Sequence, residues 1–343
     1  MYRTLLLLAA LVASAPAMAQ GRDVPGDERA GTASAQFLLV PTTARTTSLA
    51  NGLTAGLNSL SGLEGLQSNP AALMATSGTE AMFSYINFVA DIGVNTFGVA
   101  QGFGNSGVAL FVTSWDLGEI PLTTAASPDP TSVVYDASTF VIGASYAQQF
   151  TDRIAAGVTA KAIGETIDDI NGSAVAFDAG VTYTVGESGL QFGVSLRNFG
   201  TKMSYSGNGL GRSNPVNGSG GDGAFPIQVD VDNYELPSLL NFGATYTRQF
   251  AGDVSVTTLG NFRSNAYDQP EFAGGLELGY GDLVYARAGV NILPDQDVNE
   301  TEFWSLGAGV NVPVSTSGLA VDYAYRSMGD LGNVNLITAS LKF

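Results

Sequence analysis

The sequence predicts an all-β fold, a closed antiparallel transmembrane β-barrel of about fourteen strands with a small N-terminal helical plug. Three observations predict this fold class. The last residues alternate between an apolar and a polar face, similar segments recur along most of the chain between turns of alternating length, and charged residues are scarce.

The C-terminal segment 334–343 has the two-residue period of a strand with one apolar face. That face carries Phe343, Leu341, Ala339 and Ile337. A closed barrel gives such a strand a partner, because its last strand pairs with its first and leaves no open edge. The terminal phenylalanine also resembles the C-terminal signal of bacterial outer-membrane barrels.

The composition favours a barrel whose outer face meets lipid. Charged residues make up 13% of the 343 residues, about half the usual content of soluble domains, and the mean hydropathy is +0.16. Beyond the N-terminus, no apolar run approaches the roughly 20 residues that a spanning helix needs. A soluble β-sandwich rich in glycine is the alternative interpretation.

The chain contains no histidine and no cysteine. Disulfides, thiolate metal sites and catalysis by a histidine base are therefore excluded. We expect a non-enzymatic protein with no catalytic residues, no metal and no cofactor. The net charge of −17 argues against nucleic acid as a partner.

The N-terminus has the features of a secretory signal peptide over residues 1–19. Arg3 is followed by an apolar stretch at 4–15 and by the small residues Ala17 and Ala19 around a cleavage site. The apolar stretch is too short for a membrane anchor. Residues 20–32 mix charges with Gly and Pro, which predicts a disordered tail.

Residues 33–75 are predicted to form the plug. Asn69 suits a helix N-cap and Pro70 the first helical turn. Leucines recur at spacings of three and four residues, which predicts one or two short helices: Leu49, Leu53, Leu57, Leu60 and Leu63. Small residues between them allow close packing inside a barrel, although a small helical cap has the same pattern.

Residues 76–343 are predicted to form the barrel, because they contain fourteen alternating segments between turn residues. These lie near 79–89, 91–103, 106–116, 137–150, 152–165, 173–186, 189–199, 237–250, 253–264, 270–280, 282–293, 301–313, 318–327 and 332–343. Tight turns alternate with connections that are mostly longer and acidic, as in outer-membrane barrels. With both termini on the short-turn side, the long loops face outside the cell.

Eight charged residues lie on the predicted inward faces, because an outward Arg or Lys at mid-membrane costs about 2–4 kcal/mol. They are Arg153, Lys161, Asp178, Arg197, Glu277, Arg287, Asp322 and Arg326. One interpretation is that they form mutual ion pairs and hold the plug. The other is that they line a polar translocation path.

Several motifs resemble those of the PorV/PorQ family. In the plug these are Ser-Ala-Gln-Phe-Leu at 34–38, Ala44-Arg45, and Asn69-Pro70-Ala71; the barrel motifs lie at 161–167, 176–183 and 189–200. The resemblance covers roughly 34–205. It departs at Gln67 and Ser68, where the family commonly has an aromatic residue, and at 46–48. PorV/PorQ proteins are outer-membrane barrels related in architecture to the FadL fatty-acid channels.

The resemblance implies a protein of the cell outer membrane, in contact with outer-membrane lipid. For a PorV-type protein it implies a part in type IX protein secretion, with other secretion components and cargo carrying a sorting domain as partners. The alternative is a FadL-like channel for long-chain fatty acids or other hydrophobic small molecules. Such a channel would bind its solute in an apolar pocket between the plug and the inner wall.

Overall fold

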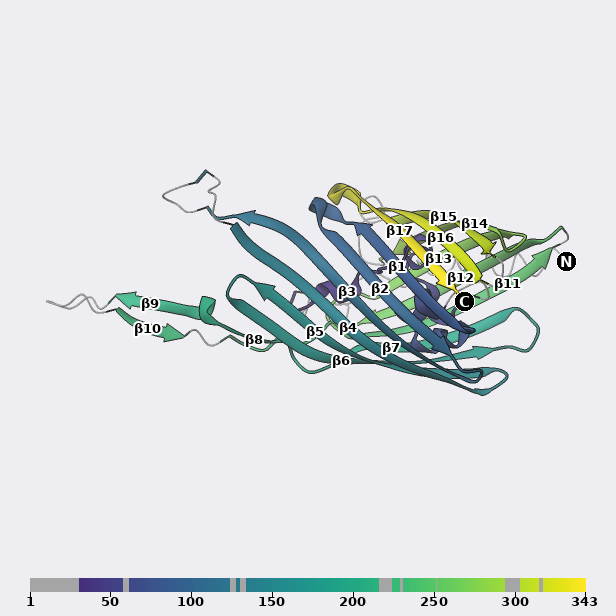
Figure 1. Cartoon of the computed structure of the whole chain (residues 1–343), viewed down its shortest axis with the longest axis horizontal. Helices are drawn as coiled ribbons and strands as arrows, with labels where there is room; N and C mark the ends of the chain where they lie inside the picture. The colour runs from purple at the N-terminus through teal and green to yellow at the C-terminus, as the bar shows by residue number, and fades with distance from the viewer. Residues whose placement is uncertain are drawn as a thin grey trace, which may run out of the picture.

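In the computed structural model, fourteen antiparallel strands form a closed barrel around short helical segments (Figure 1). The structure describes residues 31–57, 62–123, 128–129, 134–215, 224–228, 231–250, 252–293, 303–314 and 317–343. The predicted signal peptide and residues 20–30 of the predicted tail lie outside this description, as does Leu60. The predicted fold class is confirmed.

Each of the fourteen barrel strands overlaps one of the fourteen predicted segments, with ends that differ by up to five residues. They are β1 (Thr79–Asn87), β2 (Gly93–Gly102), β3 (Ser106–Pro121), β4 (Val134–Thr151), β5 (Ile154–Ile167), β6 (Ile170–Thr184), β7 (Leu190–Gly200), β11 (Leu239–Phe250), β12 (Val254–Asn265), β13 (Glu271–Tyr280), β14 (Val284–Ile292), β15 (Phe303–Val314), β16 (Ser317–Ser327) and β17 (Asn333–Lys342). Each strand pairs with the next, and β7 pairs with β11.

The ring closes between the first and the last strand. β1 pairs with β17 in a register that runs from Glu80 opposite Lys342 to Asn87 opposite Asn335. Beyond the last strand residue, the Phe343 N–H donates to the Thr79 carbonyl at 2.9 Å. Every barrel strand therefore has two neighbours, so the ring has no open edge, as a bilayer demands.

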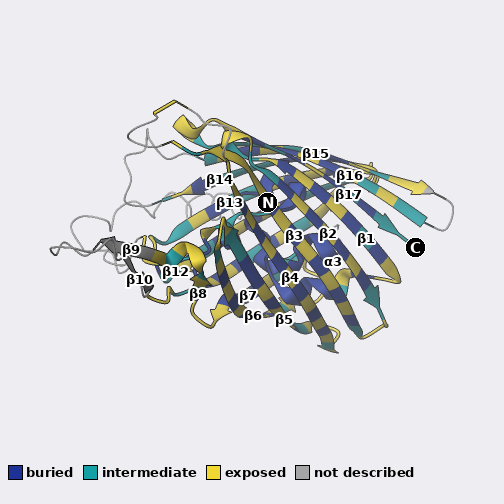
Figure 2. Ribbon diagram, turned by 60° about the vertical axis from the view of Figure 1, so that its left-hand side comes forward, coloured by how far each residue is buried: buried dark blue, intermediate teal, exposed yellow. Residues whose placement is uncertain are grey.

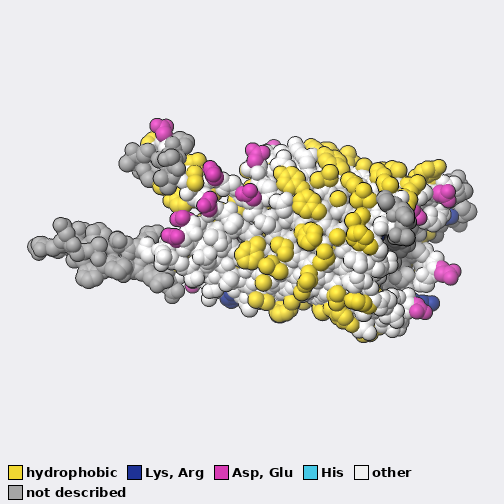
Figure 3. All heavy atoms as spheres, in the orientation of Figure 1, with side chains coloured by type: hydrophobic (Ala, Val, Ile, Leu, Met, Phe, Trp, Pro, Cys, Tyr) yellow, Lys and Arg dark blue, Asp and Glu magenta, His cyan; other side chains and the backbone are white. Residues whose placement is uncertain are grey.

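Burial alternates along the strands, as Figure 2 shows by its dark and yellow bands. In β4 almost every second residue is buried in the lumen, and the residues between them are exposed. Apolar side chains such as Phe97 and Leu110 face outward and are 54% and 60% exposed. Figure 3 shows hydrophobic and uncharged side chains over the middle of this face, with acidic ones towards its ends. That surface suits lipid.

The connections differ between the two ends of the barrel. The turns before β3, β5, β12 and β14 have two or three residues and the turn before β7 has five, whereas the long connection after β7 carries three short strands: β8 (Ser204–Gly207), β9 (Gly211–Pro215) and β10 (Ala224–Gln228). The β5–β6 turn at the loop end is an exception, because it has only two residues, 168–169. β9 and β10 pair apart from the barrel and project from one end (Figure 1). β3 and β4 have 16 and 18 residues, more than the roughly 9–11 that cross a bilayer, so they extend past the membrane at this loop end.

The described part of the plug, 33–57 and 62–75, contains five short helical segments in the lumen. They are η3 (Gln36–Leu39), α2 (Ala44–Ser48), η4 (Leu53–Ala55), α3 (Gly62–Leu66) and η5 (Pro70–Ala75). The predicted cap is present, because Asn69 Oδ1 accepts a hydrogen bond from the Ala71 N–H at 3.0 Å. In the part of the chain that the structure describes, no helix is long and apolar enough to cross a membrane.

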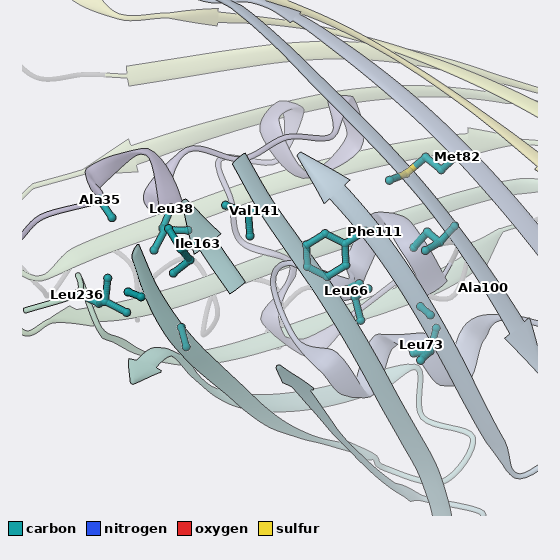
Figure 4. Packing of buried hydrophobic residues seen from close by; sticks show 14 of the residues in the cluster. Ala35, Leu38, Leu66, Leu73, Met82, Ala100, Phe111, Val141, Ile163 and Leu236 are labelled. Carbon is teal, nitrogen blue, oxygen red and sulfur yellow. The ribbon is translucent and has the colours of Figure 1, made fainter. Parts of the chain in front are cut away.

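Apolar plug side chains pack against the inner wall. Figure 4 shows Leu66 and Leu73 of the plug near Phe111 and Ala100 of the wall, all in one buried cluster. Leu49, Leu53 and Leu57 form a second cluster with Leu259 of β12. The predicted leucine pattern therefore marks the packed face of the plug.

Glycine lets the plug backbone lie directly on the wall. A Cβ at Gly193 of β7 would lie 2.1 Å from the Thr54 carbonyl oxygen, and one at Gly157 of β5 would lie 2.6 Å from the backbone of Pro70. Any larger residue would therefore push the plug away. This close approach explains part of the high glycine content.

The first described residues lie at the loop end. The Ser34 N–H donates to the Glu235 carbonyl at 2.9 Å, and Glu235 lies in the long connection between β7 and β11. Phe343 lies at the short-turn end, beside Thr79. The described part of the chain therefore begins at the loop end and runs along the lumen as the plug before β1; the N-terminus itself, predicted on the short-turn side, lies outside the described residues.

This path predicts a labelling pattern for single cysteines in the otherwise cysteine-free chain. In intact cells, Thr32→Cys should react with a maleimide carried on a polymer too large to cross the outer membrane. Asp152→Cys, exposed in the turn between β4 and β5, should react only after the outer membrane is permeabilised. Labelling of Asp152→Cys alone in intact cells would contradict the orientation.

Candidate functional site

A chain of buried ion pairs joins the plug to the barrel wall. Arg45 of α2 lies 3.2 Å from Glu64 of α3 and 3.3 Å from Asp322 of β16. On the wall, Arg287 of β14 lies 2.5 Å from Asp322 and 2.6 Å from Glu277 of β13. All five side chains are buried. Removing one partner from such a pair leaves an uncompensated charge, so the chain fixes α2 against the wall.

The strand pattern explains how the wall residues meet. Glu277 and Arg287 are paired across β13 and β14, and both face the lumen. Tyr285, two residues before Arg287, places its ring 5.2 Å from that guanidinium and 5.7 Å from that of Arg45. The electron-rich ring face stabilises both cations.

The two plug charges shift each other's pKa. Burial raises the pKa of the Glu64 carboxyl, and the neighbouring Arg45 charge acts in the opposite direction. Burial acts to lower the pKa of Arg45, but the carboxylates of Glu64 and Asp322 outweigh it and raise the pKa overall. Arg45 therefore remains a cation.

A second polar cluster lies across β5, β6 and β7. Lys161 Nζ lies 2.7 Å from Asp178 and donates to Asn198 Oδ1 at 2.5 Å. The Asn198 N–H donates to Asp178 at 2.7 Å. Asn198 has a φ of 57° where the β6–β7 register shifts, so this irregularity turns its backbone N–H towards the carboxylate.

The remaining lumenal arginines face the loop end. Arg263 lies 2.6 Å from Glu271. Arg197 Nη2 donates to the Leu38 carbonyl of the plug at 3.5 Å. Arg326 lies 5.8 Å from the centre of the Phe303 ring, and among the described residues it has no carboxylate within 4.0 Å.

Seven of the eight predicted lumenal charges lie inside the barrel. Lys161, Asp178, Glu277, Arg287 and Asp322 are buried and paired, while Arg197 and Arg326 are half-buried beside cavities. Their mutual ion pairs fit the interpretation that they hold the plug. The prediction that Arg153 faces the lumen is wrong. Arg153 is exposed in the turn before β5, because that strand begins only at Ile154.

Sequence reasoning missed Glu64, Arg263 and Glu271. The plug motif itself lies at contacts between plug and wall. Besides capping η5, the Asn69 side-chain amide donates to the carbonyls of Thr54 at 2.7 Å and Val181 at 3.2 Å. A lone acid within a run of small residues was the available signal for Glu64.

A cavity of about 310 Å³ lies between the plug and the wall at the loop end. We call it the outer cavity. Its apolar lining comes from the plug and from the ends of several strands: Leu39, Val40, Pro41, Phe88, Leu293, Met328, Val334 and Leu336. Its polar lining consists of Thr47, Asn51, Arg263, Asn265, Asp268, Glu271 and Arg326. It is therefore an amphipathic pocket whose wall is mostly apolar by surface area.

Trp115 of β3 stands beside this cavity. Its ring lies 5.7 Å from that of Phe88, which lines the outer cavity, and 6.1 Å from that of Phe37 in η3. On the other side of Val40, a small cavity of about 40 Å³ borders Trp115, Lys161 and Arg197. Trp115 therefore lines the small cavity and lies next to a ring that lines the outer cavity.

Several solved structures share this fold. The monoaromatic hydrocarbon channel CymD has a TM-score of 0.57 and 14% identity, over 89% of this chain and 98% of that one. The Ralstonia pickettii toluene transporter TbuX has 0.53 and 11%, over 86% and 96%. A Pseudomonas aeruginosa FadL homologue has 0.51 and 11%, over 89% and 98%.

These likenesses show that the chain has a FadL-like β-barrel fold. No protein-family model matches the chain, and no curated protein matches it. The finer resemblance to PorV and PorQ stays a prediction.

The ion-pair chain predicts that removing a buried cationic side chain lowers the stability of the barrel far more than removing an exposed one. Arg287→Ala should destabilise the barrel by about 3–5 kcal/mol, because Glu277 and Asp322 lose a buried partner. Lys202→Ala, which removes the exposed pair with Glu235, should cost less than about 1 kcal/mol. Thermal unfolding in detergent checks both, and equal losses would contradict this assignment.

Proposed function

We propose that this protein is a non-enzymatic outer-membrane channel that admits hydrophobic small molecules. The outer cavity carries the proposal, because it opens an apolar pocket between the plug and the wall at the end facing outside. Burial of apolar surface provides the affinity, at roughly 25 cal/mol per Å² removed from water.

The size of the outer cavity suits small solutes. An engineered cavity of about 150 Å³ in another protein binds benzene, and the outer cavity measures about 310 Å³. One or two aromatic rings, or a short hydrocarbon chain, fit this volume. The fold shared with toluene and monoaromatic hydrocarbon channels supports the same class of solute.

A role in type IX secretion rests on the motif resemblance alone. It requires surfaces that recognise sorting-domain cargo and other secretion components, and the contacts of the described residues bear on neither. The cavity favours the channel, so we develop that function further.

The channel proposal predicts that filling the outer cavity stops uptake. Met328→Trp replaces the unbranched methionine side chain with a bulkier indole ring that fills part of the cavity. Toluene entry should slow by about tenfold, equivalent to about 1.4 kcal/mol of lost solute binding. Leu331→Trp is the matched control, because Leu331 lies in the same β16–β17 connection but is 68% exposed. The measurement is entry of radiolabelled toluene into cells with an intact lipopolysaccharide layer.

Binding and solute class are measured separately. With Trp304→Phe, Trp115 is the remaining tryptophan, and saturable quenching of its fluorescence by toluene reports occupancy near Phe88. Oleate uptake tests the long-chain alternative in the same cells. If cells with and without the channel take up toluene and oleate equally, the proposed function is wrong.

A further inference from the structure

The two longest strands of the barrel continue beyond their neighbours as a two-stranded arm. The pairing of β2 with β3 ends at Asp116, and the pairing of β4 with β5 ends at Ala137. Further along, in the part of the chain that the structure describes, β3 and β4 pair as strands only with each other. This arm, residues 117–121 and 134–136, projects from the loop end (Figure 1). We call it the outer arm.

One face of the outer arm is apolar. Ile120 and Tyr135 lie directly opposite each other across the two strands. Tyr135 comes two residues before Ala137, which is buried in the lumen, so the two-residue period places both side chains on the face that continues the inner wall. Both side chains are exposed, and so is Leu117. Two strands alone leave such a face uncovered.

The other face of the outer arm is acidic. Glu119 and Asp136 lie directly opposite each other, and Asp116 lies on the same face. Like charges directly opposite each other in a sheet are destabilising. Residues 46–152 contain no Lys or Arg, and the ion pairs of the described residues include none of these three acids. Figure 3 shows acidic side chains beside hydrophobic ones at this end of the molecule.

Charge decides which partner fits the outer arm. A second copy of the chain would bring the same acids together, so pairing of arm with arm is disfavoured. Lipopolysaccharide is itself anionic and would need a bridging metal ion. Among the residues that the structure describes, no group of three or more acidic side chains is placed to hold one. A cationic partner, in contrast, offsets the repulsion between Glu119 and Asp136.

We propose that the outer arm docks an extended segment of another protein, in which basic residues alternate with apolar ones. Successive side chains of an extended segment point to opposite sides. A segment that lies along the edge of β3 therefore sets its basic residues against the acidic face and its apolar residues against the apolar face. The inference goes beyond the proposed function and does not depend on it, because the arm lies outside the lumen.

Side chains, rather than a long ladder of hydrogen bonds, select this segment. A bulge interrupts the β3–β4 register between Asp116 and Glu119, and Pro121 has no N–H to donate. Both features keep the open edge of β3 short, which protects it from unselective strand pairing. The partner is therefore recognised by its alternating side chains, and binding weakens as salt screens the exposed charges.

Short synthetic peptides test whether the two faces act together. The probe alternates lysine with valine, and its matched control has the same composition with all lysines before all valines. Fluorescence anisotropy measures the binding of each labelled peptide to the whole protein in detergent. The alternating peptide should bind about tenfold more tightly than the block peptide, and its binding should weaken as sodium chloride is raised. Equal affinity for the two peptides would overturn the proposal.

Charge reversal on the arm tests the acidic face. Glu119→Lys/Asp136→Lys should weaken binding of the alternating peptide by about tenfold, because attraction becomes repulsion. Asp232→Lys/Asp330→Lys is the matched control, because it changes the net charge equally and both acids are exposed in other connections. This control should bind the peptide as the parent protein does. Equal losses in the two double variants would show unselective charge attraction and sink the docking site.

The apolar face has its own variant. Ile120→Ser/Tyr135→Ser should lower the affinity for the alternating peptide to that for the block peptide, and unchanged affinity would contradict the proposal. Each variant should keep the heat-dependent gel mobility of a folded barrel and the toluene uptake of the parent, because the arm lies outside the lumen. Loss of uptake by the parent would refute the channel alone.

The parent protein decides between protein and lipid as the partner. If it fails to bind the alternating peptide, the proposal is wrong. Binding of magnesium-loaded lipopolysaccharide vesicles in place of the peptide would assign the arm to lipid.

Discussion

The need to satisfy every backbone hydrogen bond within lipid determines this structure. A sheet that crosses a bilayer has to close, and here the pairing of β1 with β17 completes the ring. A ring of fourteen strands encloses a lumen wider than its own side chains fill. The plug occupies that space, and glycines such as Gly193 let its backbone lie directly against the wall.

Closure of the barrel also determines on which face of the wall the charged side chains lie. Lipid excludes them from the middle of the outer face, so Lys161, Asp178, Arg287 and Asp322 lie in the lumen, where each finds a partner. The plug contributes Arg45 and Glu64 to the same arrangement. The Arg45–Asp322 contact joins the plug charges to the wall charges, so the chain holds α2 against the wall.

Much of this fold could be predicted from local sequence pattern. Two-residue alternation locates the strands and the inward side of Asp322 or Arg287, and the Asn69-Pro70 pair locates the start of η5. Arg153 was misplaced because a strand boundary moves by a residue without changing the pattern. Partners such as Arg45 and Asp322 depend on how a plug of 43 predicted residues, 33–75, folds back inside the ring. The cavities arise from that packing, and no single segment encodes them.

The location of a bound aromatic solute tests the channel account most directly. Crystals grown with iodobenzene and measured near an iodine absorption edge give that location without any assumption about residues. The account predicts an anomalous peak in the outer cavity, between Val40 of the plug and Leu336 of β17. Peaks confined to the lipid-facing surface, with the outer cavity empty, would contradict it.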